Sequence, residues 1–228
     1  MNMDLLDYIR IILGKVRFIK TFLVPFNKLI RKYSSWKMNR LFMKYGELTF
    51  QTFVDTLSSS NLRFWPEFGT LLGIYRDGDF IKYDNDFDFG AFVDDIDAIH
   101  SLLTSAGFVR EYLYYSKELN YVREATYSWK GVHIDIFYFK SEEEHDICYS
   151  FIPNSIDGQN GLCYKIKYFT FEKIELMPIV FKGLKLTIPK DTQHHLMVSY
   201  GPHFMIPDPN FKSINHNFIE GYYAYRCH

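Results

Sequence analysis

The chain has 228 residues, 47% of them hydrophobic and 19% aromatic, which supports one globular domain with a sizeable core. Its three cysteines, Cys148, Cys163 and Cys227, form neither a metal-ligand spacing nor a disulfide framework, which favours a reducing compartment. The net charge is −1, but residues 1–44 hold 10 Lys and Arg against 2 Asp and Glu, whereas the remainder is acidic. An acidic main body argues against a nucleic-acid enzyme, which needs a basic surface to meet phosphates.

Residues 4–32 are predicted to form a basic amphipathic helix, because apolar residues recur every three or four positions with Lys and Arg between them. Pro25 is expected to interrupt or kink it. No apolar run approaches the roughly 18 to 20 residues of a transmembrane helix, and the pattern does not fit a signal peptide. The helix is expected either to lie on an anionic membrane face or to pack on the domain with its basic edge in water.

A Gly-Thr pair opens the most informative stretch of the chain. Gly69 permits a tight turn and the close approach of a phosphate to the backbone. Thr70 is predicted to cap a following helix, whose N-terminus favours an anion. Arg76 is expected either to reach a phosphate or to form a surface ion pair with Asp77 or Asp79.

Three carboxylates follow at alternate positions, Asp84, Asp86 and Asp88. In a strand, residues two apart share a face, so Asp86 and Asp88 should project together while Phe87 and Phe89 enter a core. Adjacent carboxylates repel unless a positive charge lies between them. Mg²⁺ or Mn²⁺ is the candidate cation, since both prefer oxygen ligands. The alternative is a solvated acidic turn, but the aromatic residues between the acids favour a half-buried strand.

A second apolar run, residues 132–139, contains Asp135. A lone carboxylate inside a buried strand is costly unless it is paired or metal-bound. His133 shares its face, as a ligand, a proton shuttle or a structural residue.

The rest of the chain predicts further helices, strands and one long loop. Adjacent His194 and His195 should face different ways on their helix, so we expect no shared metal there. The predicted elements are helices over 35–58, 94–106 and 191–200, strands over 61–68, 108–116, 120–129 and 163–171, a surface loop over 141–161, and a hairpin over 178–189.

Taken in order, these motifs resemble the LicD/fukutin family of the nucleotidyltransferase-fold superfamily. The resemblance covers about residues 61–205. It departs from the usual pattern at Pro66, Tyr83 and Asn85, and Asn85 should point away from the face of Asp86. The matching segments are GTLLG at 69–73, Arg76, Phe80 and Ile81, the acid cluster at 84–88, HIDIF at 133–137, and IPKDTQHHLMVSYG at 188–201.

The resemblance implies an α+β fold with a nucleotidyltransferase-like mixed sheet flanked by helices. The N-terminal helix would occupy 1–34 and the catalytic domain 35–228. Asp135 would complete the metal site or act as a general base. The implied catalytic and metal-binding residues are Asp86, Asp88 and Asp135, with Mg²⁺ or Mn²⁺, and the implied substrate-binding residues are Gly69, Thr70, Arg76 and Asp84.

Members of this family transfer a phospho-alcohol, such as phosphocholine or ribitol phosphate, from a CDP-activated donor to a sugar hydroxyl of a cell-surface glycan or its lipid-linked precursor. We therefore expect this activity, at a cytoplasmic location on the inner face of the membrane through residues 4–32, with no nucleic-acid partner. One alternative is a nucleotidyltransferase that moves an NMP from an NTP to a small molecule or protein. Another is a catalytically inactive binding module of the same fold. The sequence names neither the donor alcohol nor the acceptor sugar.

Overall fold

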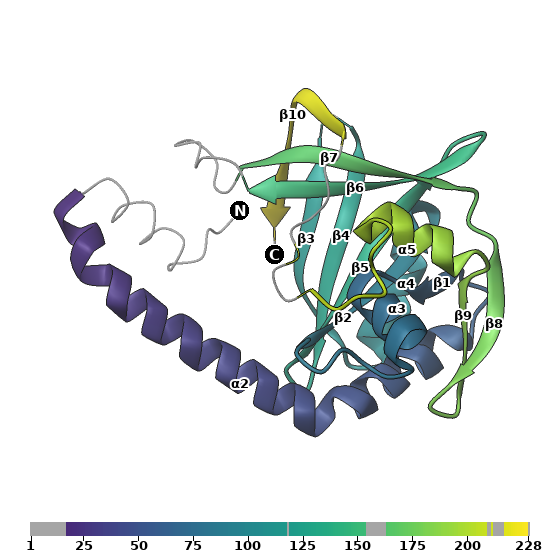
Figure 1. The fold of residues 1–228 in the computed structure, drawn as a ribbon, viewed down its shortest axis with the longest axis horizontal. Coiled ribbons are helices and arrows are strands. Elements are labelled where there is room, and N and C mark those ends of the chain that lie inside the picture. The colour runs from purple at the N-terminus through teal and green to yellow at the C-terminus, as the bar shows by residue number, and fades with distance from the viewer. Residues whose placement is uncertain (1–16, 118, 154–162, 209–210, 212–216, 228) are drawn as a thin grey trace.

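The structure is a computed structural model that describes residues 17–117, 119–153, 163–208, 211 and 217–227. A strongly curved mixed sheet forms the body, helices pack against it, and one long helix extends away from it (Figure 1). This arrangement confirms the predicted α+β class, with a mixed sheet flanked by helices and a helical segment at the N-terminal end.

Helix α2 (Arg17–Ser58) is one continuous helix of 42 residues, where the sequence predicted two helices. A proline normally kinks or ends a helix, yet the helical backbone continues through Pro25 and past residue 34. The C-terminal half of α2 packs on the sheet and buries Phe50, Phe53 and Leu57. Its N-terminal half points away from the sheet (Figure 1). Residues 4–16 of the predicted basic helix lie outside the described part of the chain.

Within that described part, no helix has both the length and the apolar composition that a membrane crossing requires.

The main sheet has eight strands in the order β1-β2-β5-β4-β3-β10-β7-β6. Strands β2 and β5 run parallel, and the other neighbours run antiparallel. Strand β6 also pairs with β5, so the six strands from β5 to β6 close into a hydrogen-bonded ring. The strands are β1 (Phe64–Pro66), β2 (Asp86–Phe92), β3 (Val109–Ser116), β4 (Tyr121–Trp129), β5 (Val132–Ser141), β6 (His145–Pro153), β7 (Cys163–Glu172) and β10 (Asn217–Cys227).

Short helices and a hairpin complete the fold. They confirm the helices predicted over 94–106 and 191–200 and the hairpin predicted over 178–189. The elements are α3 (Phe68–Leu72), the π-helical turn η1 (Gly73–Asp77), the 3-10 turn η2 (Val93–Asp95), α4 (Ile96–Ser105), α5 (Thr192–Tyr200), and the hairpin strands β8 (Leu176–Phe181) and β9 (Leu184–Pro189).

The prediction of a surface loop over 141–161 is wrong for residues 145–153, because these residues form strand β6. Its polar residue Asp146 is buried because neighbouring groups supply hydrogen-bond donors for the carboxylate. These donors are the hydroxyl of Ser141, the ammonium group of Lys173 and the backbone N–H of Ile174. The remainder of the predicted loop, 154–162, lies outside the described residues. Strand β10 was also not predicted.

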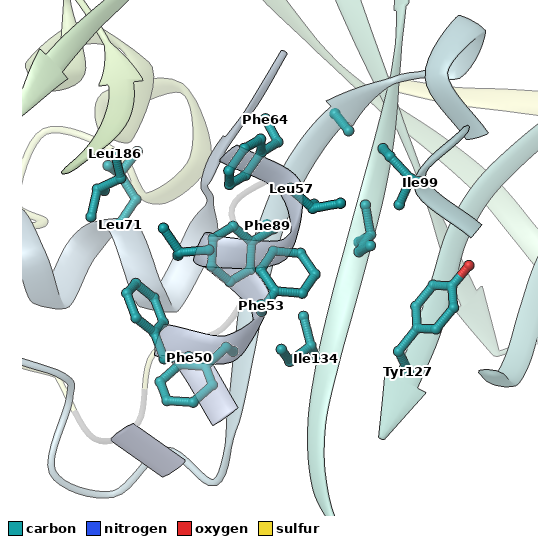
Figure 2. Packing of buried hydrophobic residues seen from close by; sticks show 14 of the residues in the cluster. Phe50, Phe53, Leu57, Phe64, Leu71, Phe89, Ile99, Tyr127, Ile134 and Leu186 are labelled. Atoms are coloured by element: carbon teal, nitrogen blue, oxygen red, sulfur yellow. The ribbon is translucent and has the colours of Figure 1, made fainter. Parts of the chain in front are cut away.

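The two faces of β2 separate the core from the acidic residues. Phe87 and Phe89 are 1% and 0% exposed, as predicted. The ring of Phe89 lies 4.3 Å from that of Phe53 on α2, and Figure 2 shows this aromatic contact at the centre of the core. Burying a Phe side chain contributes about 1.5 to 3 kcal/mol to stability. The aromatic residues of β2 and α2 thus fix the strand so that its other face carries Asp86 and Asp88.

Candidate active site

Parallel pairing of β2 with β5 brings the predicted acids together. Asp86 lies opposite His133 in the register, and Asp88 lies opposite Asp135. Since directly paired residues point to the same face, these four side chains share one side of the sheet. Each is partly exposed, whereas the residues between them on both strands are buried. Asp86, Asp88 and Asp135 therefore stand side by side on an accessible face.

Residues 67–70, which we call the Gly-Thr turn, hold Asp88 through three hydrogen bonds. The backbone N–H of Gly69 donates to Oδ2 of Asp88 at 3.1 Å. The backbone N–H of Asp88 donates to the hydroxyl of Thr70 at 2.8 Å, and the N–H of Glu67 donates to the carbonyl of Asp88 at 2.9 Å. The predicted helix cap is corrected here, because Glu67 is the N-cap of α3 and Thr70 is buried inside this helix. The Thr70 hydroxyl accepts from β2 instead.

Gly69 is required by the close approach of two carboxylates. A Cβ atom at this position would lie 2.9 Å from Oδ2 of Asp84 and 3.3 Å from Oδ2 of Asp88. Both oxygens therefore converge on the α-carbon of Gly69. This close packing brings Asp84, which precedes the strand, into the acidic cluster.

Burial raises the pKa of every acid in this cluster, and repulsion by neighbouring carboxylates raises three of these pKa values further, those of Asp84, Asp88 and Asp135. Burial, then the charge of Asp86, raises the pKa of Asp84 to about 6. The pKa of Asp86 is raised by burial, and that of Asp88 is raised well above its usual range by burial and by its acidic neighbours. Burial, then the charge of Glu124, raises the pKa of Asp135 to about 8. Such a cluster favours a bound cation, which would relieve the repulsion.

Glu124 on β4 is a neighbour that the sequence did not reveal. It is buried, it forms an ion pair with Arg123, and its pKa is raised by burial. On the same strand, the hydroxyl of Thr126 donates to Oδ1 of Asp135 at 2.6 Å. The strand pairing shifts by one residue near Arg123, which places the adjacent charged residues in a β-bulge. Arg123 and Glu124, two adjacent charged residues in an otherwise uncharged strand, were the feature of the sequence that could have indicated this neighbour.

Arg76 forms the ion pair that the sequence offered as one alternative. Its Nε and Nη2 atoms both donate to the carboxylate of Asp77, each at 2.8 Å. This contact raises the pKa of Arg76, and weaker contributions come from the charges of Tyr200 and Asp84. The side chain therefore lies at the edge of the acidic cluster. Its phosphate-binding role stays a prediction. Asp79 pairs with Lys182 at 2.8 Å.

The donor set suits a hard cation, since it consists of carboxylate oxygens. In the described residues, no group of three His, Cys, Asp or Glu side chains is arranged closely enough to hold a metal ion by itself. Mg²⁺ is usually held by one or two carboxylates together with substrate phosphates and water. Water or a substrate phosphate would thus supply the rest of the coordination shell.

Tyr200, at the end of α5, also lies close to the acids. Burial raises the pKa of its phenol well above the usual range, and the charges of Asp88, Glu67 and Asp84 raise it further. The sequence had marked Tyr200 as the end of a predicted helix and as part of the matching segment 188–201, but not as a site residue. Three separate segments, namely the Gly-Thr turn, the β2–β5 pair and α5, therefore meet at one site.

Comparison with known proteins finds relatives of this chain. The human protein named ribitol-5-phosphate transferase FKTN is 27% identical over 168 residues, which cover 73% of this chain and 34% of FKTN. The human ribitol 5-phosphate transferase FKRP is 28% identical over 163 residues, 65% of this chain and 30% of FKRP. A protein of Rickettsia typhi is 31% identical over 148 residues, 61% of this chain and 44% of that protein.

The chain spans about a third of the length of the two human relatives. A family model described as LicD/FKTN/FKRP, nucleotidyltransferase domain, matches residues 61–191. This range includes the Gly-Thr turn, the acidic strand β2 and Asp135. The chain therefore belongs to the LicD/FKTN/FKRP nucleotidyltransferase-domain family.

Proposed function

We propose that the protein transfers a phospho-alcohol from a CDP-activated donor to a hydroxyl of a glycan or lipid-linked glycan acceptor. One observation carries the proposal: Asp86, Asp88 and Asp135 stand together on adjoining strands, and the Gly-Thr turn fixes Asp88. Family membership and the names of the two human relatives give the reaction class. Phosphocholine, ribitol phosphate and glycerol phosphate are all candidate groups.

In this reaction the acceptor oxygen attacks the phosphorus bonded to the alcohol. A new phosphodiester bond forms, the bond to the cytidine phosphate breaks, and CMP leaves with the bonding electron pair. The acceptor proton needs a base. Asp135 suits this role because its pKa of about 8 allows it both to take and to release a proton near neutral pH. The hydrogen bond from Thr126 fixes the orientation of this carboxyl group.

Asp86 and Asp88 would hold Mg²⁺ or Mn²⁺, which would supply positive charge for the donor phosphates and the leaving group. Asp84 converges on the same space beside Gly69, as a further ligand or as a positioning neighbour. If Asp135 instead joins the ligand set, the proton must leave through another base. Comparing the pH–rate profiles of wild type and an Asp135→Asn variant separates these two roles.

A donor screen tests the proposed activity. With Mg²⁺ present, we expect one of CDP-choline, CDP-ribitol, CDP-glycerol or CDP-ethanolamine to raise the melting temperature, and CMP to form once a glycan acceptor is added. Two readouts, CMP and pyrophosphate, are measured in parallel, with each NTP as a comparison. An Asp88→Asn variant should give background CMP release.

The same screen distinguishes the alternatives. Pyrophosphate release from an NTP would replace the proposal with a nucleotidyltransferase, which can use the same three acids. A fully folded protein that binds a donor but releases neither product would indicate a binding module. The position of Asp86, Asp88 and Asp135 on an accessible face favours an enzyme over that module.

We also propose that the exposed segment of α2 at residues 32–46 rests on an anionic membrane surface. Tyr33, Trp36 and Met43 are 64%, 54% and 82% exposed. Their spacing of three and seven residues places them on one face of the helix. Residues 32–46 hold no Asp or Glu but four basic residues, Lys32, Lys37, Arg40 and Lys44. Aromatic residues interleaved with Lys and Arg are typical of helices at membrane interfaces.

An Arg40→Glu variant is expected to bind anionic vesicles at least about tenfold more weakly, because each basic residue contributes about 1 kcal/mol at such a surface and the reversed charge adds a repulsion of similar size. The change also removes the guanidinium that lies 5.6 Å from the ring centre of Trp36. Sedimentation with phosphatidylglycerol-containing vesicles measures the binding. The matched control is Lys185→Glu, which reverses an exposed charge on hairpin strand β9. Equal binding by both variants would rule out this face of α2 as the contact.

A further inference from the structure

A buried acid–base pair joins α5 to the Gly-Thr turn. Glu67 and His195 lie 128 residues apart in the chain, and their side chains are 0% and 4% exposed. Nε2 of His195 lies 2.9 Å from Oε1 and 2.8 Å from Oε2 of Glu67. Acids are almost never fully buried unless they are paired. Neither residue belongs to the acidic cluster itself.

The surrounding donors fix the proton on the histidine side of this contact. The indole N–H of Trp65 donates to Oε2 of Glu67 at 2.6 Å, and the backbone N–H of Phe68 donates to Oε1 at 3.2 Å. Because these groups can only donate, both oxygens of Glu67 act as acceptors toward them. We therefore assign the proton of the contact to Nε2 of His195, which then donates to Glu67. The ring of His195 stacks on Phe171 at 4.3 Å, which holds its plane.

Glu67 acts on the site through its backbone as well as its side chain. The backbone N–H of Glu67 donates to the carbonyl of Asp88, and its carboxylate caps the N-terminus of α3. Gly69, which lies two residues after Glu67, donates its own N–H to the Asp88 carboxylate. Phe68 between them has a φ of +40°, a conformation that is unfavourable for a bulky side chain. Contacts on both sides of Phe68 must therefore hold the backbone in this conformation. On the N-terminal side, the side-chain contacts of Glu67 do so.

Helix α5 contributes at both of its ends. His195 contacts Glu67, while Tyr200 lies where its phenol senses the charges of Asp88 and Asp84. Loss of the His195 contact would weaken the connection between the helix and the turn. The contact is thus a connection between two parts of the site that are distant in sequence.

We propose that the Glu67–His195 pair is a positioning device that ties α5 to the turn of Gly69 and Thr70 and so sets the Asp88 carboxylate and the Tyr200 phenol for the reaction. The catalytic part of this inference rests on the proposed function. The structural part, that the pair keeps the turn in its observed conformation, holds independently of the proposed function. Chemical groups misplaced by about 1 Å reduce a rate about 100-fold.

Three variants on one helix test the proposal. His195→Leu removes the donor, His195→Gln keeps an N–H near the position of Nε2, and His194→Leu is the matched control because His194 is exposed. Hydrogen–deuterium exchange is measured over residues 66–72, with circular dichroism as the check on folding. In His195→Leu we expect this segment to exchange at least about tenfold faster. His195→Gln should restore slow exchange to within about threefold, and the control should match wild type.

The kinetic arm uses the donor found by the screen. We expect kcat of His195→Leu to fall about 10- to 100-fold with a smaller change in KM, because the turn positions rather than contacts the acceptor. Unchanged exchange over 66–72 in folded His195→Leu would overturn the proposal. Faster exchange with unchanged kcat would overturn its catalytic part. If wild type transfers nothing from any donor, the proposed function fails, and the exchange result alone decides the role of the pair.

Discussion

An Asp88→Asn variant is expected to lose about 10³-fold in transfer activity while its metal-free form melts at a higher temperature than wild type. The activity loss corresponds to about 4 kcal/mol of transition-state stabilisation, a reasonable magnitude for a carboxylate that holds a catalytic cation. The gain in stability has a separate cause. Asp88 is disfavoured as an anion by burial and by the charges of Asp86, Asp135 and Asp84. An amide of the same shape removes that repulsion and still accepts from Gly69.

The control for this variant is Asp94→Asn, an exposed acid that follows the same strand. It should leave both activity and melting temperature near wild type. Melting is followed by calorimetry without divalent cations at about pH 8, where more of these acids are ionised than at lower pH. Asp88→Asn with full activity would remove the acidic cluster from the mechanism. Lower stability of its metal-free form would mean that the Asp88 contacts outweigh the repulsion.

The parts of the site that sequence predicts are those encoded locally. Alternation of acids with Phe87 and Phe89 predicts a strand with two distinct faces, because side-chain direction in a strand has a period of two. The same reasoning places Asp135 on a second strand. That these strands pair in parallel with Asp88 opposite Asp135 is consistent with both apolar runs being buried. The roles of these residues as metal ligands or base stay predictions.

The parts that the sequence misses depend on contacts between distant segments. Glu124 enters the cluster because β4 pairs with β5 and bulges at Arg123, and register is not visible in one strand alone. His195 meets Glu67 across 128 positions. Thr70 had local features of a cap, yet its hydroxyl accepts from β2. The local sequence pattern predicts the helix or strand that carries each of these residues. The contact that its side chain makes depends on which distant segment packs against that element.

Strand β6 was missed for a related reason. The acidic run of residues 142–144 directly before it predicts a loop when each residue is judged by its own polarity. Asp146 is nevertheless buried, because donors from three separate positions satisfy its carboxylate. Similarly, two helices were predicted where α2 is continuous through Pro25. A proline weakens a helix but does not by itself decide where the helix ends.

The metal-free protein is expected to be less stable at about pH 8 than at about pH 5, and a divalent cation should restore stability mainly at the higher pH. The folded pKa values of Asp84, about 6, and of Asp135, about 8, exceed the ordinary value of 3.8. Between the ordinary value of 3.8 and these raised values, the folded state binds more protons than the unfolded state. The free energy of unfolding therefore falls as pH rises through this range. His100 and Lys167, whose pKa values are both lowered, act in the opposite direction, but they are two groups against several acids.

A cation competes with protons for the same oxygens, so its effect should grow as the acids lose their protons. We expect millimolar Mg²⁺ or Mn²⁺ to raise the melting temperature by roughly 5 °C or more at about pH 8 and by much less at about pH 5. NaCl at equal ionic strength controls for screening, and Asp88→Asn should lose most of the gain. Equal gains at both pH values would place the cation away from these acids. Since this measurement needs neither donor nor acceptor, it tests the acidic cluster as a cation site independently of the chemistry that the protein performs.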